Sequence, residues 1–304
     1  MQSGISIGCL GEVMLELVPG EGAQATLGVA GDTYNTAVYL RHVAPDVPVE
    51  YITGLGRDGF SDRILGHMEG FGVGSARVWH HPTRGPGLYA IETDAAGERR
   101  FTYWRNASAA RTLGDPEMPD IERLLAGLSH VFLSGISLAI LAQANRDRLF
   151  AALEDFRLGG GKVAFDSNYR PHLWHDPALA RRETERAWRL CDIAMPSVDD
   201  EQALFEDATE TDVLRRFDCY GIAQGVLKRG AAGPIGFDGV TLEAPQQPER
   251  VLDTTAAGDS FNAAYLAELL QGRGNVAAMQ AGHALACRVI AQRGAIIFTQ
   301  EDVT

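Results

Sequence analysis

The sequence has few cysteines, and their spacing suits neither a disulfide framework nor a metal site. Its 304 residues include four, and no two of them form a C-x-x-C pair. We expect free, mostly buried thiols in a reducing compartment. The N-terminal segment also lacks a basic region and a signal-peptide core, which indicates a cytoplasmic protein. The four are Cys9, Cys191, Cys219 and Cys287.

Long apolar runs and positive charge are also scarce. No run of about 18 apolar residues is present, so no transmembrane helix is expected. The 27 Lys and Arg against 40 Asp and Glu give a net charge of −13. Such a balance opposes a nucleic-acid or membrane-surface partner. A small anionic ligand is still possible, but it needs local cations.

Short apolar runs that end in Gly, Ser, Asp or Asn alternate with helix-like segments. Segments 146–160 and 177–191 have apolar residues at helical spacing. This alternation predicts an α/β fold with a mostly parallel central sheet and helices on both faces. Ligands bind such sheets at the carboxyl ends of the strands. The expected strands lie within 5–12, 130–137, 162–168, 192–201 and 225–230.

Two regions follow a different pattern and predict a small β-layer beside the main sheet. Residues 86–105 read as two alternating strands around the turn "DAAGE". With residues 12–30 they are too short for a separate domain, so we expect one domain over 1–304 carrying a β-sheet lid. Alternation places Phe101, Tyr103 and Arg105 on one face of their strand.

The stretch "DTTAAGDSF" (253–261) places small residues directly before a predicted helix. A helix N-terminus exposes unpaired amides and the positive end of its dipole, and small residues let a phosphate approach them. Ala256, Ala257 and Gly258 would form that surface, with Asp259 in the first helical turn. Asp is also a common N-cap, so the segment alone leaves a plain helix start open.

Four segments together resemble the ribokinase/PfkB family of carbohydrate kinases. "DTTAAGDSF" resembles the family's D-T-x-G-A-G-D signature, with Ala256 in place of its first glycine. This departure leaves open whether the position needs a positive φ. The other three segments occur in the family's order and are "AGDTYNTAVYLRHV" (30–43), "TGLGRDGFSDRILGHMEGFGV" (53–73) and "VLKRGAAG" (226–233).

The resemblance implies a ribokinase-like fold and phosphoryl transfer from ATP, with Mg²⁺, to a sugar hydroxyl. Asp259 would be the catalytic base, and the turn 256–259 would be an anion hole. Segments 87–110, 133–141, 166–174 and 251–261 resemble family members that phosphorylate the C6 hydroxyl of a keto-deoxy sugar acid. The implied substrate contacts are Gly31, Asp32, Asn35, Tyr89, Tyr103, Arg105 and Arg170.

The residues themselves support a sugar acid as the substrate. Guanidinium groups match carboxylates in a two-pronged geometry, so Arg105 and Arg170 are candidates for binding its carboxylate. The alternative is a solvated arginine on an edge strand, with tyrosines that only pack the layer. A kinase of a neutral sugar such as fructose or ribose, or a non-catalytic sugar-acid-binding protein, are the competing functions.

The resemblance also implies contacts to the nucleotide and the metal. Asp166, Asp200 and Glu201 would act on Mg²⁺ indirectly, although "DDE" also suits an ordinary helix start. Residues 166–170 could instead form a polar turn without a ligand role, and His283 could be an ordinary helical residue. His172 and His175 have no clear third ligand for zinc. The implied ATP contacts are Asn168, Ser197, Lys228, Gly230, Gly233, Gly258 and His283.

The predicted β-layer has strand edges that another subunit can cover. We therefore expect a homo-oligomer.

Overall fold

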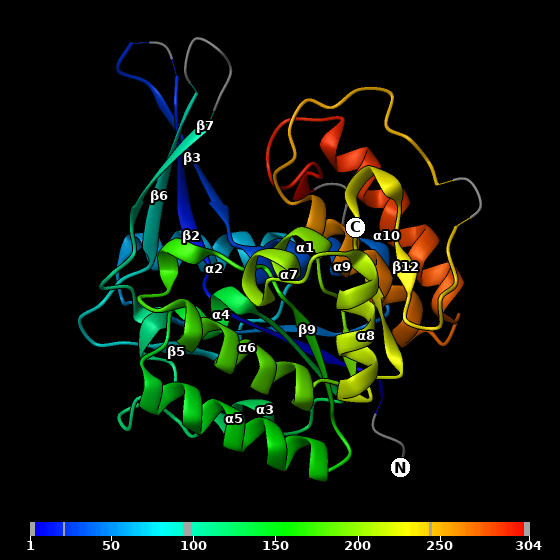
Figure 1. Ribbon diagram of the computed structural model, residues 1–304. Coiled ribbons are helices and arrows are strands. Elements are labelled where there is room, and N and C mark those ends of the chain that lie inside the picture. The colour runs from blue at the N-terminus through cyan, green and yellow to red at the C-terminus, as the bar shows by residue number, and fades with distance from the viewer. Residues whose placement is uncertain (1–3, 21, 94–98, 243–244, 301–304) are drawn as a thin grey trace.

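The computed structural model describes residues 4–20, 22–93, 99–242 and 245–300. The main sheet has eight strands in the order β12-β11-β10-β9-β8-β1-β4-β5 (Figure 1). Neighbouring strands are parallel except for β12, which is antiparallel to β11. Its strands are β1 (Ile7–Leu10), β4 (Val49–Leu55), β5 (Val78–His80), β8 (His130–Ser134), β9 (Lys162–Asp166), β10 (Ile193–Ala194), β11 (Gln224–Leu227) and β12 (Ile235–Gly236).

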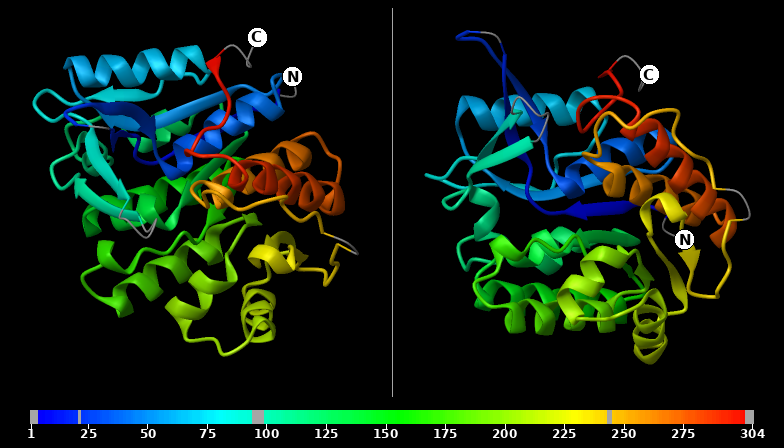
Figure 2. Two further views of the ribbon diagram at one scale, coloured as in Figure 1. Left: turned by 90° about the horizontal axis from the view of Figure 1, so that it is seen from above. Right: turned by 45° about the horizontal axis from the view of Figure 1, so that its top comes forward.

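Helices cover both faces of this sheet, as the two views of Figure 2 show. One face carries α1 (Asp32–Val43), α2 (Gly59–Gly70), α9 (Ala257–Leu270) and α10 (Asn275–Ile290). The other face carries α3 (Ile121–Leu125), α4 (Gly135–Ala139), α5 (Gln143–Leu158), α6 (Pro177–Leu190), α7 (Val198–Phe205) and α8 (Glu210–Tyr220). Short 3-10 turns are η1 (Ala109–Thr112), η2 (Pro171–Leu173) and η3 (Gly230–Ala232).

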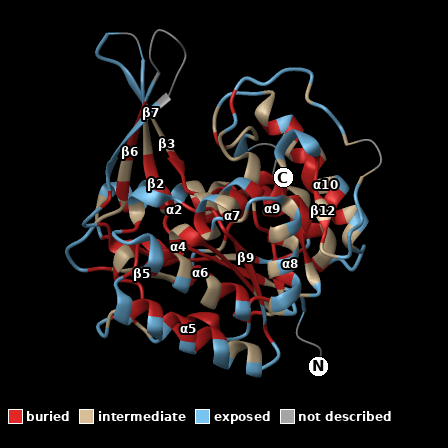
Figure 3. Ribbon diagram, viewed as in Figure 1, coloured by how far each residue is buried: buried red, intermediate tan, exposed pale blue. Residues whose placement is uncertain are grey.

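The core lies between the sheet and these two helical layers. Strand β1 is buried along its whole length, as strands covered on both faces are. Figure 3 shows the same concentration of buried residues in the sheet and on the inner sides of the helices. On the α5–α6 side, the buried Trp188 packs edge-on against Phe165 and Phe217, with ring centroids 4.6 and 4.8 Å apart.

A second sheet of four strands stands apart from the main one (Figure 1). Its order is β3-β2-β6-β7, and Tyr89 of β6 lies opposite Tyr103 of β7. The expected β-layer is therefore confirmed, although the predicted turn 94–98 lies outside the described residues. We call these four strands the small sheet: β2 (Met14–Pro19), β3 (Ala25–Ala30), β6 (Gly87–Thr93) and β7 (Arg99–Trp104).

The fold class predicted from the sequence is confirmed: a mostly parallel α/β sheet accompanied by a smaller sheet. All four cysteines are free; Cys219 on α8 is exposed rather than buried, whereas the other three are buried. Among the described residues, no helix is long and apolar enough to cross a membrane.

Candidate active site

A cleft of about 900 Å³ lies where the main sheet meets the small sheet. Its floor comes from the carboxyl ends of parallel strands, the usual ligand position in this architecture. Residues that end or follow β1, β9, β10 and β11 supply it: Glu12, Asp166, Asn168, Ser197 and Lys228. The small sheet adds Met14, Tyr89, Phe101 and Tyr103, and Arg105 follows β7 directly. Residues far apart in the sequence therefore share one cavity.

The turn before α9 forms one wall of the cleft. Ala256 is the N-cap, with φ 59° and ψ 17°, and makes no side-chain capping bond. Asp259 is therefore the third residue of the helix and not its cap. The question that the sequence left open is also answered, because Ala256 adopts the left-handed conformation that glycine adopts at lower cost.

Asp259 lies where the N-termini of α1 and α9 meet. Asn35 of α1 donates from Nδ2 to Asp259 Oδ2 at 2.8 Å. The Thr36 hydroxyl donates to the Asp259 carbonyl oxygen at 3.2 Å. Burial, together with the negative charge of Asp32, raises the pKa of Asp259 to about 8. The carboxyl is thus held in a fixed place and binds a proton more strongly than an ordinary aspartate.

Asp32 and Gly31 lie beside it at the start of α1. Asp32 Oδ2 accepts hydrogen bonds from Asn168 Nδ2, at 2.8 Å, and from the Ser134 hydroxyl. A Cβ on Gly31 would lie 2.3 Å from the carbonyl oxygen of Glu12, so only glycine fits there. Gly31 and Asp32 both line the cleft.

A buried polar cluster supports the turn from behind. Lys228 Nζ lies 2.9 Å from Asp166 Oδ1 and donates to Asn262 Oδ1 at 3.0 Å. Asn262 Nδ2 in turn donates to Asp166 Oδ2 at 2.6 Å. A Cβ on Gly258 would lie 3.7 Å from Lys228 Nζ, which places this positive charge next to the turn. The sequence analysis missed Asn262, although its position three residues after Asp259 is one helical turn away.

Two arginines also line the cleft, in different settings. Arg105 is 5% exposed and pairs with the buried Glu12, with Nε donating to Oε2 at 2.8 Å. Arg170 is 47% exposed, and its nearest carboxylate, on Asp200, lies 3.9 Å away. The Arg170 guanidinium is therefore more available to a ligand than that of Arg105.

Aromatic side chains connect the small sheet to the main body at the same place. The Tyr103 ring stacks on His172 of η2 with centroids 5.8 Å apart, and Arg105 lies 5.7 Å from that ring. The Tyr89 hydroxyl donates to Glu16. Phe101, Tyr103 and Arg105 share the cleft, as their alternation in the sequence predicted.

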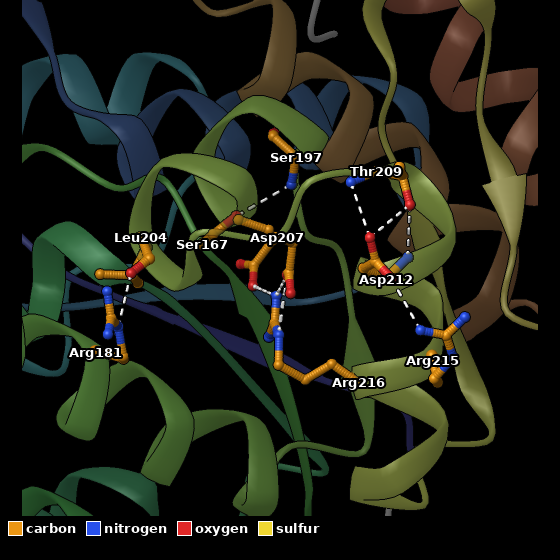
Figure 4. A network of polar contacts seen from close by, with 10 residues as sticks. Ser167, Arg181, Ser197, Leu204, Asp207, Thr209, Asp212, Arg215 and Arg216 are labelled. Carbon is orange, nitrogen blue, oxygen red and sulfur yellow. Dashed lines mark hydrogen bonds and ion pairs between the residues drawn. The ribbon is translucent and has the colours of Figure 1, made fainter.

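The adjacent acids Asp200 and Glu201 point to different places. Asp200 lines the cleft, where burial and nearby Asp166 raise its pKa to about 6. Glu201 lies outside it: its fully buried carboxylate accepts from Arg216 Nη2 at 2.9 Å. Figure 4 shows Arg216 also bonded to Asp207, at 2.6 Å. Contrary to the sequence-based expectation for Glu201, of these two neighbours Asp200 lines the cleft and Glu201 does not.

Ser197 approaches the cleft as the N-cap of α7, where it makes no side-chain capping bond. Its backbone amide donates to the Ser167 hydroxyl at 3.0 Å (Figure 4). That bond ties the start of α7 to the loop that follows β9.

Three expected nucleotide contacts do not line the cleft. Gly230 begins η3 and Gly233 follows it, with φ of 55° and 75°, and Arg229 Nε donates to the Gly233 carbonyl at 2.9 Å. His283 Nε2 donates to the Gln246 carbonyl at 2.7 Å. Conversely, the sequence analysis missed Glu12 and the stretch 251–255 as cleft-lining segments.

Carboxylates at the cleft raise the question of a metal site. Among the described residues, no three His, Cys, Asp or Glu side chains gather into a ready-made metal site. His172 and His175 are not part of such a group either. A metal here would therefore rely on few protein ligands.

Replacing Asp259 with Asn should change how stability depends on pH. An unfolded aspartate ionises near pH 3.8, whereas Asp259 ionises near 8 in the fold, so the native state holds the extra proton between these values. Wild-type stability then falls as pH rises through that window. Without ligand, the Tm of Asp259→Asn minus that of wild type should increase from about pH 4 to pH 8. Above pH 8 this difference should stay constant.

The exposed Asp46 supplies the control. Asp46→Asn removes the same charge from the surface and should follow the wild-type pH profile. A Tm difference between Asp259→Asn and wild type that does not change with pH would show that the fold does not oppose ionisation of Asp259.

Comparison with known proteins agrees with this architecture. The family model described as pfkB family carbohydrate kinase matches residues 6–302. A 2-dehydro-3-deoxygluconokinase from Dickeya dadantii is 44% identical over 300 residues, covering 96% of both chains. One from Escherichia coli K12 is 42% identical over 301 residues, again covering 96% of both.

A solved structure shares the fold at lower sequence identity. A putative ribokinase II from E. coli, in complex with ATP and Mg²⁺, superposes with a TM-score of 0.84 at 22% identity. The superposition covers 99% of this chain and 97% of that one. The resemblance carried by the four sequence segments is confirmed, and the chain belongs to the pfkB family of carbohydrate kinases.

Proposed function

We propose that this chain transfers the γ-phosphoryl group of ATP to the C6 hydroxyl of 2-dehydro-3-deoxy-D-gluconate. The hydroxyl oxygen forms a bond to the γ-phosphorus, the bond from that phosphorus to the bridging oxygen breaks, and ADP leaves. The product is 2-dehydro-3-deoxy-6-phosphogluconate. The observation that carries the proposal is that Arg105 and Arg170 line the same cleft as Asp259, in a chain of net charge −13. The names of the two curated relatives support the same substrate.

Asp259 is the general base in this proposal. It takes the proton of the C6 hydroxyl as the phosphoryl group moves. A carboxylate whose pKa is raised holds that proton better than an ordinary one, which suits a base working near neutral pH. The hydrogen bond from Asn35 holds the carboxylate in position before substrate binds.

The turn before α9 stabilises the transferred group. Backbone amides of Ala257, Gly258 and Asp259 lie at the positive end of the helix dipole. Lys228 adds a positive charge from behind the turn, held in place by Asp166 and Asn262. Charge that develops on the phosphoryl oxygens thus meets donors that are already in place.

The acids at the cleft fit Mg²⁺, which prefers oxygen ligands. Asp200, with Asp166 nearby, would hold the ion through few direct contacts. Mg²⁺ held there would supply positive charge to the phosphate oxygens. Asn168 and Ser197 would lie along the nucleotide. Gly230, Gly233 and His283 stay predictions, since they lie off the cleft lining.

Opposite the phosphate side, the small sheet and α1 would bind the sugar acid. Asp32, Asn35 and the close backbone at Gly31 offer partners for hydroxyl groups. Arg170 would bind the carboxylate, with Tyr89 and Tyr103 on the small sheet covering the substrate and excluding water. Arg105 is engaged by Glu12, so we assign it a shared role: it adds positive field and holds the sheet in position.

A kinase of a neutral sugar such as fructose or ribose would give the half-exposed Arg170 no carboxylate on the substrate to bind, whereas Arg105 is already paired with Glu12. A non-catalytic binding protein would not need a carboxyl with a raised pKa beside an anion-binding turn. Both alternatives therefore explain fewer of the observations.

We also propose a cytoplasmic homo-oligomer. Four unpaired cysteines suit a reducing, ATP-containing compartment. Strands β3 and β7 are the edges of the small sheet, and pairing with a second subunit would cover them.

Arg170 provides the test of substrate class. We expect ATP-dependent phosphorylation of 2-dehydro-3-deoxy-D-gluconate at a kcat/KM at least about 100-fold above that for fructose or ribose. Arg170→Gln should raise the KM for the acid about tenfold or more, because a charge-assisted contact is worth about 1.5–3 kcal/mol. Coupled measurement of ADP release, with each sugar in turn, gives these constants.

Arg215 on α8 is the matched control, being exposed and far from the cleft lining. Arg215→Gln should leave all constants unchanged. Better turnover of a neutral sugar by the wild type would refute the sugar-acid assignment. An equal loss for acid and neutral sugars in Arg170→Gln would refute the carboxylate contact.

Ala256 tests the turn itself. Ala256→Gly keeps the left-handed conformation accessible, so kcat should stay within about threefold of wild type. Ala256→Val places a β-branched residue at positive φ, where it is strongly disfavoured, and should lower kcat about tenfold or more. The ADP-release assay at saturating substrates measures both. Equal activity of the two variants would mean that catalysis does not depend on this backbone conformation.

A further inference from the structure

A second cavity, of about 600 Å³, lies across a short loop from the catalytic cleft. Residues 173–176 of that loop line it, together with η1 and the first turns of α5 and α6. Its size falls within the range of small-molecule sites, which is about 300–1,000 Å³. Neither the sequence motifs nor the phosphoryl transfer above makes use of it.

Three arginines line this cavity: Arg111, Arg146 and Arg182. Arg111, on η1, is partly buried, and no hydrogen bond or ion pair joins its guanidinium to another residue in the part of the chain that the structure describes. Burial lowers its pKa; the nearby Glu12 carboxylate opposes this effect, and Arg105 and Arg84 add to it. A partly buried guanidinium whose donors have no acceptor in the described chain is available to an anion that enters the cavity.

Arg146 is even more enclosed, with 4% of its surface exposed. Its Nη1 donates to the carbonyls of Leu138 and Leu141, at 3.2 and 2.7 Å, and its guanidinium lies 5.2 Å from the ring centre of Trp174. Its Nε is buried and finds no acceptor among the described residues. Carbonyl oxygens, the Gln143 side chain and an aromatic face fix this group, and the charges of Glu183 and Asp147 act on it only from a distance, without an ion pair.

The acids near the cavity are already engaged. Asp176 lines it, but its carboxylate accepts from the Ala178 amide at 2.9 Å and caps α6. Glu183 pairs with Arg182 at 3.1 Å. The lining therefore keeps a net positive charge within a strongly acidic chain.

The start of α5 adds to this field. The helix has 16 residues, and its N-cap Ala142 makes no side-chain capping bond. Both Ala142 and Gln143 line the cavity, so the positive end of a full-length helix dipole is directed toward it. The helix end acts together with Arg111 and Arg146.

We propose that this cavity is a second binding site, for a small organic phosphate of about the size of a sugar phosphate. Guanidinium groups and a helix N-terminus are the groups that recognise phosphate oxygens. The volume leaves room for a carbon chain besides the phosphate group.

The loop places this site in contact with the catalytic cleft. Arg170 and His172 line the cleft, whereas residues 173–176 line the second cavity directly after them. In the same way Ile136 of α4 faces the cleft and Ala139 the second cavity. The same loop therefore contributes residues to both cavities.

Isothermal titration calorimetry of the full chain with 6-phosphogluconate tests the site without measuring turnover. Inorganic phosphate in a parallel titration distinguishes an organic phosphate from the free ion. We expect binding of 6-phosphogluconate at two sites in wild type, and a loss of at least about tenfold in affinity at one of them in Arg111→Gln. Arg170→Gln should weaken only the other site.

Arg123, an exposed residue of α3 that lines neither cavity, supplies the control. Arg123→Gln should bind like wild type. Trp174 gives a second readout: its fluorescence should change as the site fills, and Trp174→Phe should lose that signal while calorimetry still detects binding. The fluorescence measurement tests the site without any arginine substitution.

Unchanged affinities in a folded Arg111→Gln would overturn the proposal. So would binding that Arg170→Gln alone abolishes, because that would place all of it in the catalytic cleft. Equal affinity for inorganic phosphate would overturn the organic part of the assignment. The outcome for Arg111→Gln does not depend on the chain being a sugar-acid kinase, whereas the outcome for Arg170→Gln rests on the proposed function.

Discussion

The contact between Asn35 and Asp259 is the constraint on which the rest of the site depends. It joins the N-terminal turns of α1 and α9 through a hydrogen bond of 2.8 Å. Because both helices begin at the cleft, their first turns present amides, a carboxyl and an amide side chain to the same volume. The cost is a carboxyl whose ionisation the fold opposes, and that cost is also what makes it a suitable base.

Two buried ion pairs hold the surroundings of this contact. Lys228 pairs with Asp166 behind the turn, and Arg105 pairs with Glu12 beneath the small sheet. Buried pairs contribute little net stability, but losing one partner leaves an uncompensated charge that costs about 3–5 kcal/mol. These two ion pairs hold the side chains around the cleft in position. Substitution of Arg105 would therefore lower both the stability of the fold and any binding to which it contributes. Arg170, half exposed, is free of that complication.

Much of this arrangement was predictable because its signals are local. Apolar runs predicted the strands, and alternation predicted that Phe101 and Tyr103 of β7, and Arg105 directly after it, share one side. Small residues before an apolar helix predicted the turn at Ala256. Each of these patterns is written within about ten consecutive residues.

What the sequence analysis missed depends on distance or on helix phase. Glu12 and Arg105 are 93 positions apart, and no local pattern pairs them. Asp200 and Glu201 are neighbours, and only the residue at which α7 begins decides which one faces the cleft. Here Glu201 turns inward to Arg216 on α8, an element whose position the sequence pattern did not specify.

The central claim is that Asp259 takes the proton from the hydroxyl that is phosphorylated. Its most direct test is the turnover of Asp259→Asn together with the affinity of that variant for 2-dehydro-3-deoxy-D-gluconate by calorimetry. The account predicts a kcat at least about 100-fold below wild type, the scale of general-base catalysis, with the Kd for the sugar acid within a few-fold. Turnover near the wild-type value in a folded variant would contradict it.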